Sequence, residues 1–526
     1  MEVYLFAVIS FFIWSFGLVQ CDFPTTLQGP FNPVTAPPDN DTLSRSIIDL
    51  PDTDPRVQTT VEPFHPEQIS VSLSSDYDSV WISWVTGDYQ IGQDIIPLDS
   101  NSVGSVVQYG KLGMQPTSEA VGYSLVYNQR YDFDDSLNYS SGILHHVRLS
   151  GLEPGVMYQY QCGDPWIPAM SDVFYFSTMP ASNPESYPRR IAVVGDLGLS
   201  YNTSTTLSHL LATHPDLLLL VGGVSYSDLY TTDGFRANIS SDYSPLDQTF
   251  QPRWDYWGRF MQPLTAKVPT MVVAGKHEIE RQAGDYAFVA YSSRFAFPSE
   301  ESGSSSPLYY SFNAGGVHFI VLNPYTAYDN SSDQYIWLET DLNYVNRSET
   351  PWLVATWYSP WYSTFQAHYR EAECMRMEME ALLYNNNVDI VFNSHVHAYE
   401  RSNRVYNYNL DPCGPVYITI GSGGCAEEIS IAHTDDPGSC PDPSSTGDDI
   451  IGNFCPVNLT YKGEFCSDRQ PEYSAYRESS FGHGTLEVTN ETHALWSWNR
   501  NEDFYETAAD IVYIVREPER CLMNAK

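Results

Sequence analysis

The sequence is short of positive charge. Among its 526 residues, 26 Lys and Arg stand against 65 Asp and Glu, which gives a formal net charge of −39 at pH 7. This charge repels a phosphate polyanion at long range, so nucleic acid is excluded as a partner, and so is a membrane bound through a basic face. The acidity fits a protein that stays soluble in an acidic, extracellular or vacuolar setting. An ordinary solvated surface explains it equally well.

Positive charge is also missing from the N-terminus. The apolar run over residues 3–19 is short for a bilayer span, and it lies where a secretory signal belongs. We therefore predict a signal peptide over residues 1–21 and secretion to the extracellular space or cell wall, with the vacuole as the other destination. Because Lys and Arg are absent before the run, an uncleaved membrane anchor is the alternative.

Cysteine is scarce, and the C-x-x-C spacing of many zinc sites does not occur. In an oxidising compartment, four of the cysteines predict disulfides that hold together a surface insertion over about residues 425–470: Cys425, Cys440, Cys455 and Cys466. A zinc site there is the weaker alternative. Export also fits the N-glycosylation sequons at Asn40, Asn138, Asn202, Asn238, Asn330, Asn346, Asn458 and Asn490.

The first part of the chain predicts an all-β module. Residues 22–62 are rich in Pro, Thr and Asp without a sustained period, so we expect an extended lead-in. Short alternating segments follow, and in one of them Val80, Ile82 and Trp84 lie on one face of a strand. The stretch GLEPGVMYQYQCG resembles the late strands of a fibronectin type III sandwich. We therefore predict a small β-sandwich over residues 63–178.

After Arg190, apolar strands alternate with helical stretches. RIAVVGDLG, DLLLLVGGVSY, VPTMVVAGKHE, VDIVFNSHVHAYE and GPVYITIGSGG each read as a buried strand that ends in polar or Gly-rich residues. EAECMRMEMEALLYNNN has apolar residues at helical spacing and ends in an Asn run. The alternation predicts an α/β layered domain over residues 188–505, with functional loops at the strand ends, and a C-terminal tail over residues 506–526.

Groups suited to hard cations end several of these strands. They are Asp196, Tyr226, His277, Glu278, His395 and His397. Each has an ordinary explanation by itself, since an Asp after a strand often caps a turn, a Tyr often packs in a core and an H-x-H pair often faces solvent. Because they all lie at the ends of successive strands, we predict that together they form a binding site.

Longer stretches add a second signal. VVGDLG, QPRWDYWGRFMQP, FNAGGVHFIVLN, HYREAECMRMEMEALLY and VDIVFNSHVHAYERSNRVYNYNLDPCGPVYITIG are similar to the two-domain plant purple acid phosphatases, and the likeness covers residues 63–505. The resemblance implies a mixed fold: a fibronectin type III-like β-sandwich, then a calcineurin-like α/β metallophosphoesterase domain with two packed sheets flanked by helices. It also implies a secreted glycoprotein that hydrolyses phosphate monoesters at acidic pH and, like many plant members, forms homodimers.

The resemblance further implies a dinuclear centre of ferric iron with zinc, manganese or ferrous iron. Two cations about 3.5 Å apart neutralise a phosphomonoester and supply the attacking hydroxide. The family's metal ligands come from the motifs GDxG, GDxxY, GNHE, VxxH and GHxH, and tyrosinate bound to iron gives the purple colour.

Some of these ligands match this chain and others do not. The matching residues are Asp196, Tyr226, His395 and His397. The substituted positions are Gly223 for the bridging aspartate, Lys276 for the asparagine and Tyr358 for the VxxH histidine. The substitutions fall on the divalent half of the centre, where a protonated lysine repels a cation and glycine offers no oxygen. We therefore expect one ferric ion at the retained half and loss of the second metal.

Two residues match those that the family uses on the substrate. His277 in GKHE and His368 in QAHYRE correspond to imidazoles that contact the phosphate group or protonate its leaving group, so we expect catalytic or phosphate-binding roles for them. Such groups can bind phosphate without hydrolysing it quickly. Shared ancestry alone is the other explanation for their presence.

Three functions are compatible with these residues. The first is an acid phosphatase by descent whose activity is weak or absent and which still binds phosphate monoesters, inorganic phosphate or a partner. The second is an active acid phosphatase, for phosphate scavenging or of the phytase type, that uses one iron with the ammonium group of Lys276. The third is a non-catalytic extracellular interaction glycoprotein. The metal content of the native protein distinguishes among them.

Overall fold

The computed structural model describes residues 29–38, 48–59, 62–130, 138–167, 169–184, 186–188, 190–231, 234, 249–282, 286–424, 427–443, 464–505, 507–518 and 521. The predicted signal peptide and part of the predicted Cys-rich insertion lie outside these residues. Within the described part of the chain, no helix is both long enough and apolar enough to cross a membrane.

The N-terminal module is a sandwich of antiparallel sheets. One sheet has the order β2-β3-β10-β7, from β2 (Glu67–Leu73), β3 (Val80–Thr86), β10 (Ile143–Leu149) and β7 (Tyr123–Leu125). The other has the order β12-β11-β5-β6, with β13 also on β11: β12 (Ala169–Met170), β11 (Met157–Asp164), β5 (Val106–Lys111), β6 (Ser118–Val121) and β13 (Phe174–Ser177). Val80, Ile82 and Trp84 are buried, as the alternation in β3 predicted.

Short elements complete this module. A three-stranded sheet joins β4 (Gln90–Gly92), β9 (Asn138–Ser140) and β8 (Asn128–Gln129), and η1 (Ser100–Ser102) is a single 3-10 turn.

The C-terminal domain contains two larger sheets. The eight-stranded sheet runs β1 (Val34–Thr35), β25 (Ser474–Glu478), β21 (Tyr399–Ser402), β24 (Val416–Ile420), β20 (Ile390–Asn393), β19 (Trp352–Thr356), β18 (Val317–Val321) and β17 (Tyr310–Ala314). The six-stranded sheet runs β16 (Thr270–Val273), β15 (Leu217–Val221), β14 (Ile191–Val194), β26 (Gly482–Val488), β27 (His493–Arg500) and β28 (Asp510–Val515). A hairpin of β22 (Val405–Tyr406) and β23 (Asn409–Leu410) lies outside both sheets.

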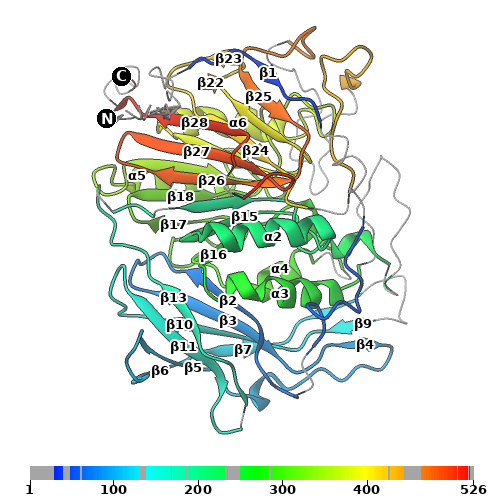
Figure 1. The fold of residues 1–526 in the computed structure, drawn as a ribbon, viewed down its shortest axis with the longest axis vertical. Helices are drawn as coiled ribbons and strands as arrows, with labels where there is room; N and C mark the ends of the chain where they lie inside the picture. The colour runs from blue at the N-terminus through cyan, green and yellow to red at the C-terminus, as the bar shows by residue number, and fades with distance from the viewer. Residues whose placement is uncertain are drawn as a thin grey trace, which may run out of the picture.

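Helices cover these sheets. They are α2 (Tyr201–Thr213), α3 (Pro252–Thr265), α4 (Val289–Arg294), α5 (Asp333–Tyr344) and α6 (Glu373–Asn385), with the 3-10 turns η2 (Ser227–Leu229) and η3 (Lys276–Glu278). Figure 1 shows α2 and α3 between the sandwich at one end of the molecule and the two sheets at the other. The mixed fold predicted from the sequence is therefore the fold that forms, and α6 covers the segment expected to be helical.

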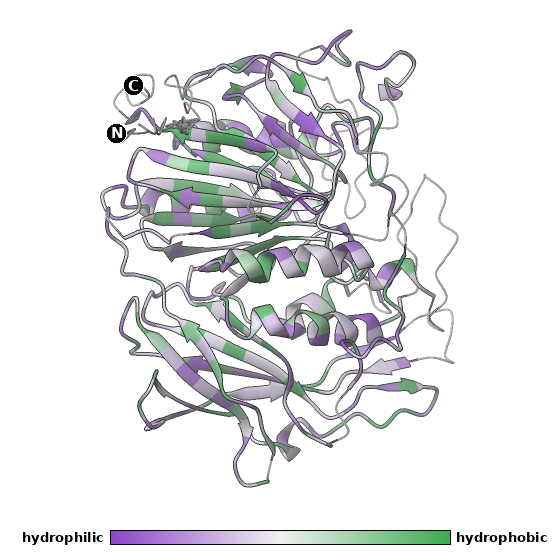
Figure 2. Cartoon of the chain, in the orientation of Figure 1, coloured by the Kyte–Doolittle hydropathy of each residue, from purple (hydrophilic) through white to green (hydrophobic). Residues whose placement is uncertain are grey.

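Parallel pairing in both sheets positions the loops that matter for function. β14, β15 and β16 are parallel neighbours, as are β18, β19, β20 and β24. Their residues are buried throughout, which explains why these segments read as continuous apolar runs instead of alternating ones. Figure 2 shows hydrophobic residues gathered on these central strands.

The segment expected as a C-terminal tail is instead part of the domain. Residues 510–515 form β28, which pairs antiparallel with β27, and Cys521 is disulfide-bonded to Cys413. The alternating sequence DIVYIV suits an edge strand, and this explains the correction to the predicted tail. A second disulfide joins Cys440 to Cys466 inside the predicted insertion.

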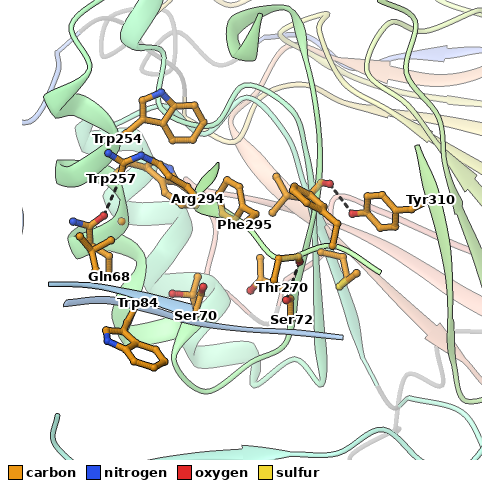
Figure 3. Close-up of a pocket in the computed structure, with 17 residues that line it drawn as sticks. Gln68, Ser70, Ser72, Trp84, Trp254, Trp257, Thr270, Arg294, Phe295 and Tyr310 are labelled. Atoms are coloured by element: carbon orange, nitrogen blue, oxygen red, sulfur yellow. Dashed lines mark hydrogen bonds between the residues drawn. The ribbon is translucent and has the colours of Figure 1, made fainter. Parts of the chain in front are cut away.

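The sandwich and the C-terminal domain share a buried interface. A pocket there is lined by Gln68 and Trp84 from the sandwich and by Trp254, Phe295 and Tyr310 from the C-terminal domain, among others (Figure 3). Its aromatic lining makes the interface resemble the core of a single domain.

An ion pair lies at this interface. The guanidinium of Arg294 bonds both carboxylate oxygens of Asp255 at 3.1 Å, with side chains only 6% and 2% exposed. Both groups also contact the sandwich. Asp255 accepts from Tyr139 at 2.7 Å and from Gln68 at 3.0 Å, and Arg294 donates to the same two side chains at 2.7 and 3.1 Å. The pair therefore couples the two modules.

Replacement of Asp255 tests this coupling. Asp255→Ala leaves the guanidinium of Arg294 buried without its partner charge, so we expect the free energy of unfolding to fall by about 3–5 kcal/mol in urea denaturation. The matched control is Asp76→Ala, whose carboxylate pairs with Arg148 at 3.0 Å but is 70% exposed, and we expect a loss below about 1 kcal/mol. Equal losses in the two variants would contradict the structural role of the interface pair.

Candidate functional site

The predicted ligand positions come together from both large sheets. They lie on loops after parallel strands: Asp196 after β14, Gly223 and Tyr226 after β15, Lys276 and His277 after β16, Tyr358 after β19, and His395 and His397 after β20. The carboxyl ends of parallel strands meet at one edge of a sheet, and the packing of the two sheets brings the two edges together. All of these residues are buried.

The carboxylate of Asp196 lies at the centre of the cluster and accepts hydrogen bonds from four donors. Its Oδ1 accepts from the hydroxyl of Tyr226 at 2.7 Å and from that of Tyr358 at 2.5 Å. Its Oδ2 accepts from the backbone N–H of His395 at 2.8 Å and from the hydroxyl of Ser394. An ionised carboxylate has about four lone-pair sites, so these donors use its whole accepting capacity.

Tyr358 fills the space between two loops of the other sheet. A Cβ added at Gly222 would lie 2.3 Å from its Cδ2, and one added at Gly275 would lie 2.8 Å from the same atom. Burial, together with the neighbouring carboxylate of Asp196, raises the pKa of Tyr358 well above its usual value. The phenol therefore keeps the proton that it donates.

Gly223 stands against the same carboxylate. Its φ of 62° is left-handed, and a Cβ added there would lie 2.2 Å from Oδ1 of Asp196. Its backbone N–H donates to Glu278 at 3.1 Å, and those of Val224 and Gly275 donate to the same carboxylate at 2.8 Å. Glu278, expected among the cation-binding groups, instead holds the backbone of two loops.

His277 lies between carboxylates. Its Nδ1 is 3.0 Å from Asp228, its Nε2 is 3.5 Å from Glu427, and its ring centroid is 3.9 Å from that of Tyr226. Burial lowers the pKa of His277, but the carboxylates of Asp228, Glu427 and Glu278 outweigh burial and raise it to about 9. His277 is therefore an imidazolium at acidic and neutral pH.

The same glutamate reaches a second imidazole. Oε2 of Glu427 is 3.4 Å from Nε2 of His397, which is also 3.3 Å from the hydroxyl of Tyr226. The structure thus brings Asp196, Tyr226 and His397, the predicted iron ligands, into one chain of contacts. Sequence reasoning missed Glu427, because nothing near GSGGCAEE marks it as a partner of residues so distant in the chain.

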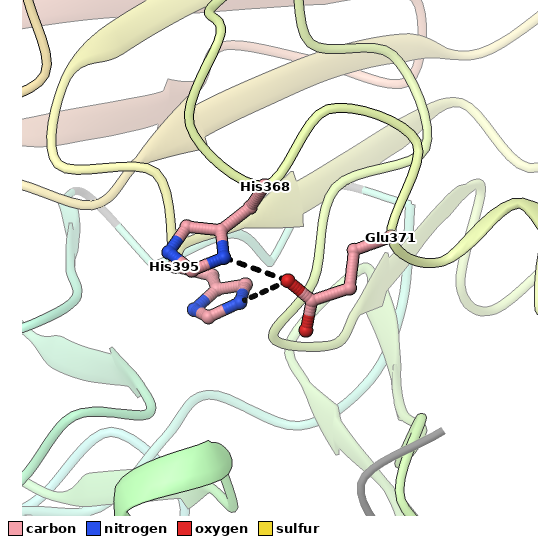
Figure 4. Close-up of side chains that lie close together, drawn as sticks. All are labelled: His368, Glu371 and His395. Atoms are coloured by element: carbon pink, nitrogen blue, oxygen red, sulfur yellow. Dashed lines mark hydrogen bonds and ion pairs between the residues drawn. The ribbon is translucent and has the colours of Figure 1, made fainter. Parts of the chain in front are cut away.

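His395 turns away from this chain of contacts. Its Nε2 is 3.0 Å from Oε2 of Glu371, and Nδ1 of His368 is 2.7 Å from the same oxygen (Figure 4). Burial and the neighbouring imidazole of His368 lower the pKa of His395 to about 3, and the charge of Lys276 adds to this shift. Sequence reasoning also missed Glu371, although its spacing three residues after His368 could have indicated it.

The backbone is strained at these positions. Asp196, Tyr226, His368, Arg370 and His395 have φ between 50° and 70°, in the left-handed region that non-glycine residues seldom adopt. Such strain persists only where the surroundings impose it, and it concentrates at functional sites.

A dinuclear centre of the kind implied by the resemblance does not fit these side chains. The lone pairs of Asp196 are occupied, Gly223 has neither an oxygen nor room for one, and the imidazole of His395 faces Glu371. Lys276 adds a buried positive charge on the side of the missing ligands.

Comparison with known proteins places the chain among phosphatases. Residues 66–178 match the family model "Purple acid Phosphatase, N-terminal domain", residues 189–399 match "Calcineurin-like phosphoesterase" and residues 460–509 match "Iron/zinc purple acid phosphatase-like protein C". Purple acid phosphatase 15 of Arabidopsis thaliana is 61% identical over 504 residues, which are 95% of this chain and 94% of that protein.

More distant relatives agree. Phosphoenolpyruvate phosphatase of Allium cepa is 34% identical over 473 residues, which cover 87% of this chain and 83% of that protein. The structure of a purple acid phosphatase from yellow lupin (Lupinus luteus) seeds superposes with a TM-score of 0.66 at 18% identity, covering 88% of this chain and 76% of that one. This last likeness is one of fold.

The hydrogen bond from Tyr358 to Asp196 can be tested by deletion of the hydroxyl. Tyr358→Phe removes a donor from a buried carboxylate, so we expect the free energy of unfolding to fall by about 1.5–3 kcal/mol. In the control, Tyr325→Phe, the lost hydroxyl is hydrogen-bonded to the neutral hydroxyl of Ser359 at 3.1 Å, and we expect a loss of about 1 kcal/mol. The hypothesis fails if thermal and urea unfolding rank the two variants the other way.

The imidazolium of His277 predicts a pH dependence of stability. Its pKa is about 9 in the folded chain against an ordinary 6.5, so its contribution is complete below pH 6.5 and is lost as the pH rises to 9. This loss is about 3 kcal/mol. His277→Gln and Asp228→Asn should each flatten the decline of unfolding free energy measured between pH 6.5 and 9. An unchanged slope in both variants would show that His277 is not an imidazolium.

Proposed function

The chain belongs to the purple acid phosphatase family, and we propose that it binds phosphate monoesters or inorganic phosphate but hydrolyses them far more slowly than a dinuclear enzyme does. Members of the family are dinuclear enzymes that carry iron and a second metal, and acid phosphatase activity is this chain's function by homology. We propose how much of that activity remains with the residues that this chain has at the metal-ligand positions.

The observation that carries the proposal is the closed hydrogen-bond shell of Asp196. Tyr358 donates to this carboxylate at 2.5 Å and occupies the place expected for a histidine ligand. In a two-metal mechanism the metals neutralise the phosphoryl oxygens and supply the hydroxide. The protonated hydroxyl of Tyr358 can supply neither, so the geometry favours slow turnover.

The position of Glu427 supports retained anion binding. Its carboxylate lies 3.5 Å from Nε2 of His277 and 3.4 Å from that of His397, so this point already favours an anion. Phosphoryl oxygens accept the same charge-assisted hydrogen bonds. The side chain of Glu427 is 26% exposed, which allows it to move aside for a phosphate group that competes for the two imidazoles.

We also propose that the protein is a secreted glycoprotein. The apolar N-terminus and the sequons support export. Asn330, Asn346 and Asn490 are exposed in the structure, where an oligosaccharide could be attached. The disulfides Cys413–Cys521 and Cys440–Cys466 favour an oxidising compartment.

Steady-state kinetics test the proposed function. With iron and zinc supplied, we expect the wild-type protein to hydrolyse p-nitrophenyl phosphate at least ~100-fold below the ~10 per second of a typical enzyme. Calorimetry should still detect binding of inorganic phosphate at pH 5.5, and His277→Gln should weaken it. A wild-type rate near ~10 per second would refute the loss of activity, and absence of phosphate binding would refute the retained anion site.

A restored variant is the matched control for this experiment. Gly223→Asp, Lys276→Asn and Tyr358→His together supply the ligands that the family uses. The new Cβ at position 223 would lie 2.2 Å from Oδ1 and 2.7 Å from Cα of Asp196, so the loop backbone must shift as well as the Asp196 side chain. We expect this variant to gain activity over wild type. Lys276→Asn alone distinguishes the alternative of an active enzyme that uses this ammonium group, because only that alternative predicts a lower rate than wild type.

A further inference from the structure

We propose that His368, Glu371 and His395 bind one divalent transition-metal ion, with a set of ligands that shares only His395 with the dinuclear centre implied by the family. The proposal goes beyond the proposed function and does not depend on it, because His368 and Glu371 are not among the family's ligands and the site includes neither Asp196 nor Tyr226. Zn²⁺ is the ion that we use to argue and test it.

The donor atoms already have the spacing of a metal's ligands. Nδ1 of His368 and Nε2 of His395 lie 2.7 and 3.0 Å from the same oxygen of Glu371, and the three donor atoms lie within 4.8 Å of one another. Zinc binds such atoms at about 2.0–2.2 Å, which puts the ligands of a four-coordinate ion roughly 3.3 Å apart. Small movements of the side chains would therefore admit the ion.

The orientation of the two rings agrees with this spacing. Figure 4 shows both imidazoles turning a nitrogen toward the carboxylate of Glu371. The rings stack with centroids 3.6 Å apart and planes inclined by 29°. When the ion is bound, each neutral imidazole carries its proton on the far nitrogen, Nε2 of His368 and Nδ1 of His395, so both near nitrogens offer a lone pair.

The chemistry of the donors selects the class of ion. Two imidazoles with one carboxylate suit Zn²⁺ and other divalent first-row metals, and they leave a coordination position for water or an anion. The carboxylate of Glu371 supplies the negative charge that two neutral imidazoles lack. The positive charge of Lys276 acts on His395, and it opposes a second cation near this imidazole.

The loop that carries the first two donors is held in place. Arg370 lies 4.2 Å above the ring of Tyr408 and donates to the carbonyl of Glu464 at 2.7 Å. The hydroxyl of Tyr369 accepts from the backbone N–H of Cys466, which belongs to a disulfide. The donors therefore stand on a supported backbone, as a precise metal site requires. The side chain of His368 is 33% exposed, so the ion has a path from solvent.

Metal binding by four proteins tests the proposal. The wild-type chain, Glu371→Gln, His368→Ala and the control His397→Ala are stripped with a chelator, titrated with Zn²⁺ in a calorimeter and then assayed for zinc by elemental analysis. We expect one Zn²⁺ per wild-type chain, affinity at least ~100-fold weaker in Glu371→Gln and His368→Ala, and an unchanged affinity in His397→Ala. His397 is chosen because it belongs to the predicted iron half-site and not to the proposed one.

Other outcomes overturn the proposal. A wild-type chain that binds no Zn²⁺ refutes the site, and a His397→Ala variant that loses as much affinity as His368→Ala places the metal elsewhere. Addition of Fe³⁺ to the chelator-treated wild type is an independent test. Purple colour from tyrosinate would indicate that the iron binds at the half-site of Tyr226 and not at the proposed site. Failure of zinc binding leaves the kinetic prediction for p-nitrophenyl phosphate untouched, so the two hypotheses can fail separately.

Loss of folding must be separated from loss of a ligand. Thermal melting without metal is measured for every variant. Glu371 contacts two imidazoles, so glutamine is chosen to replace it because glutamine keeps the size of the side chain and one acceptor oxygen. His368 is exposed enough for a substitution to be tolerated. Where His368→Ala melts below the wild type, His368→Gln replaces it, and retained zinc affinity in a folded His368→Gln would contradict the site.

Discussion

One buried carboxylate, that of Asp196, joins the loops of the two large sheets. Tyr226 reaches it from the loop after β15 in the six-stranded sheet, and Tyr358 and Ser394 reach it from loops after β19 and β20 in the eight-stranded sheet. A buried charge is costly unless it is fully hydrogen-bonded. This requirement brings three loops to the loop that carries Asp196, and Asp196 and Tyr226 have left-handed backbones at this point.

The charges around this carboxylate form two separate groups. In one, His277 lies between Asp228 and Glu427, and Glu427 continues to His397. In the other, Glu371 lies between two imidazoles. Asp228 and Glu427 face the imidazolium of His277, as a low dielectric demands, whereas Glu371 forms hydrogen bonds with two imidazoles. Because the two groups share no residue, the proposed anion binding at the first and the proposed metal binding at the second can be tested separately.

The sandwich takes part in this arrangement. Strand β2 packs on α3, whose residue Asp255 bonds Arg294 at the interface. The next residue toward the N-terminus, Trp254, donates its indole N–H to Glu280 at 2.9 Å, two residues beyond the glutamate that holds the loops after β15 and β16. The interface and the site are thus parts of one continuous buried network, and the N-terminal module packs against the segment that supports these loops.

Local sequence determined the elements and the identity of the candidate ligands. Apolar runs and alternation depend on residues close in the chain, so they predicted the strands that carry Asp196 and His395 and the face of Trp84, and the motifs located Gly223, Lys276 and Tyr358. Only the tertiary structure decided which groups meet. The contacts of Glu427 with His277, the turn of His395 toward Glu371 and the pairing of β28 depend on how distant segments pack, and no local period encodes that.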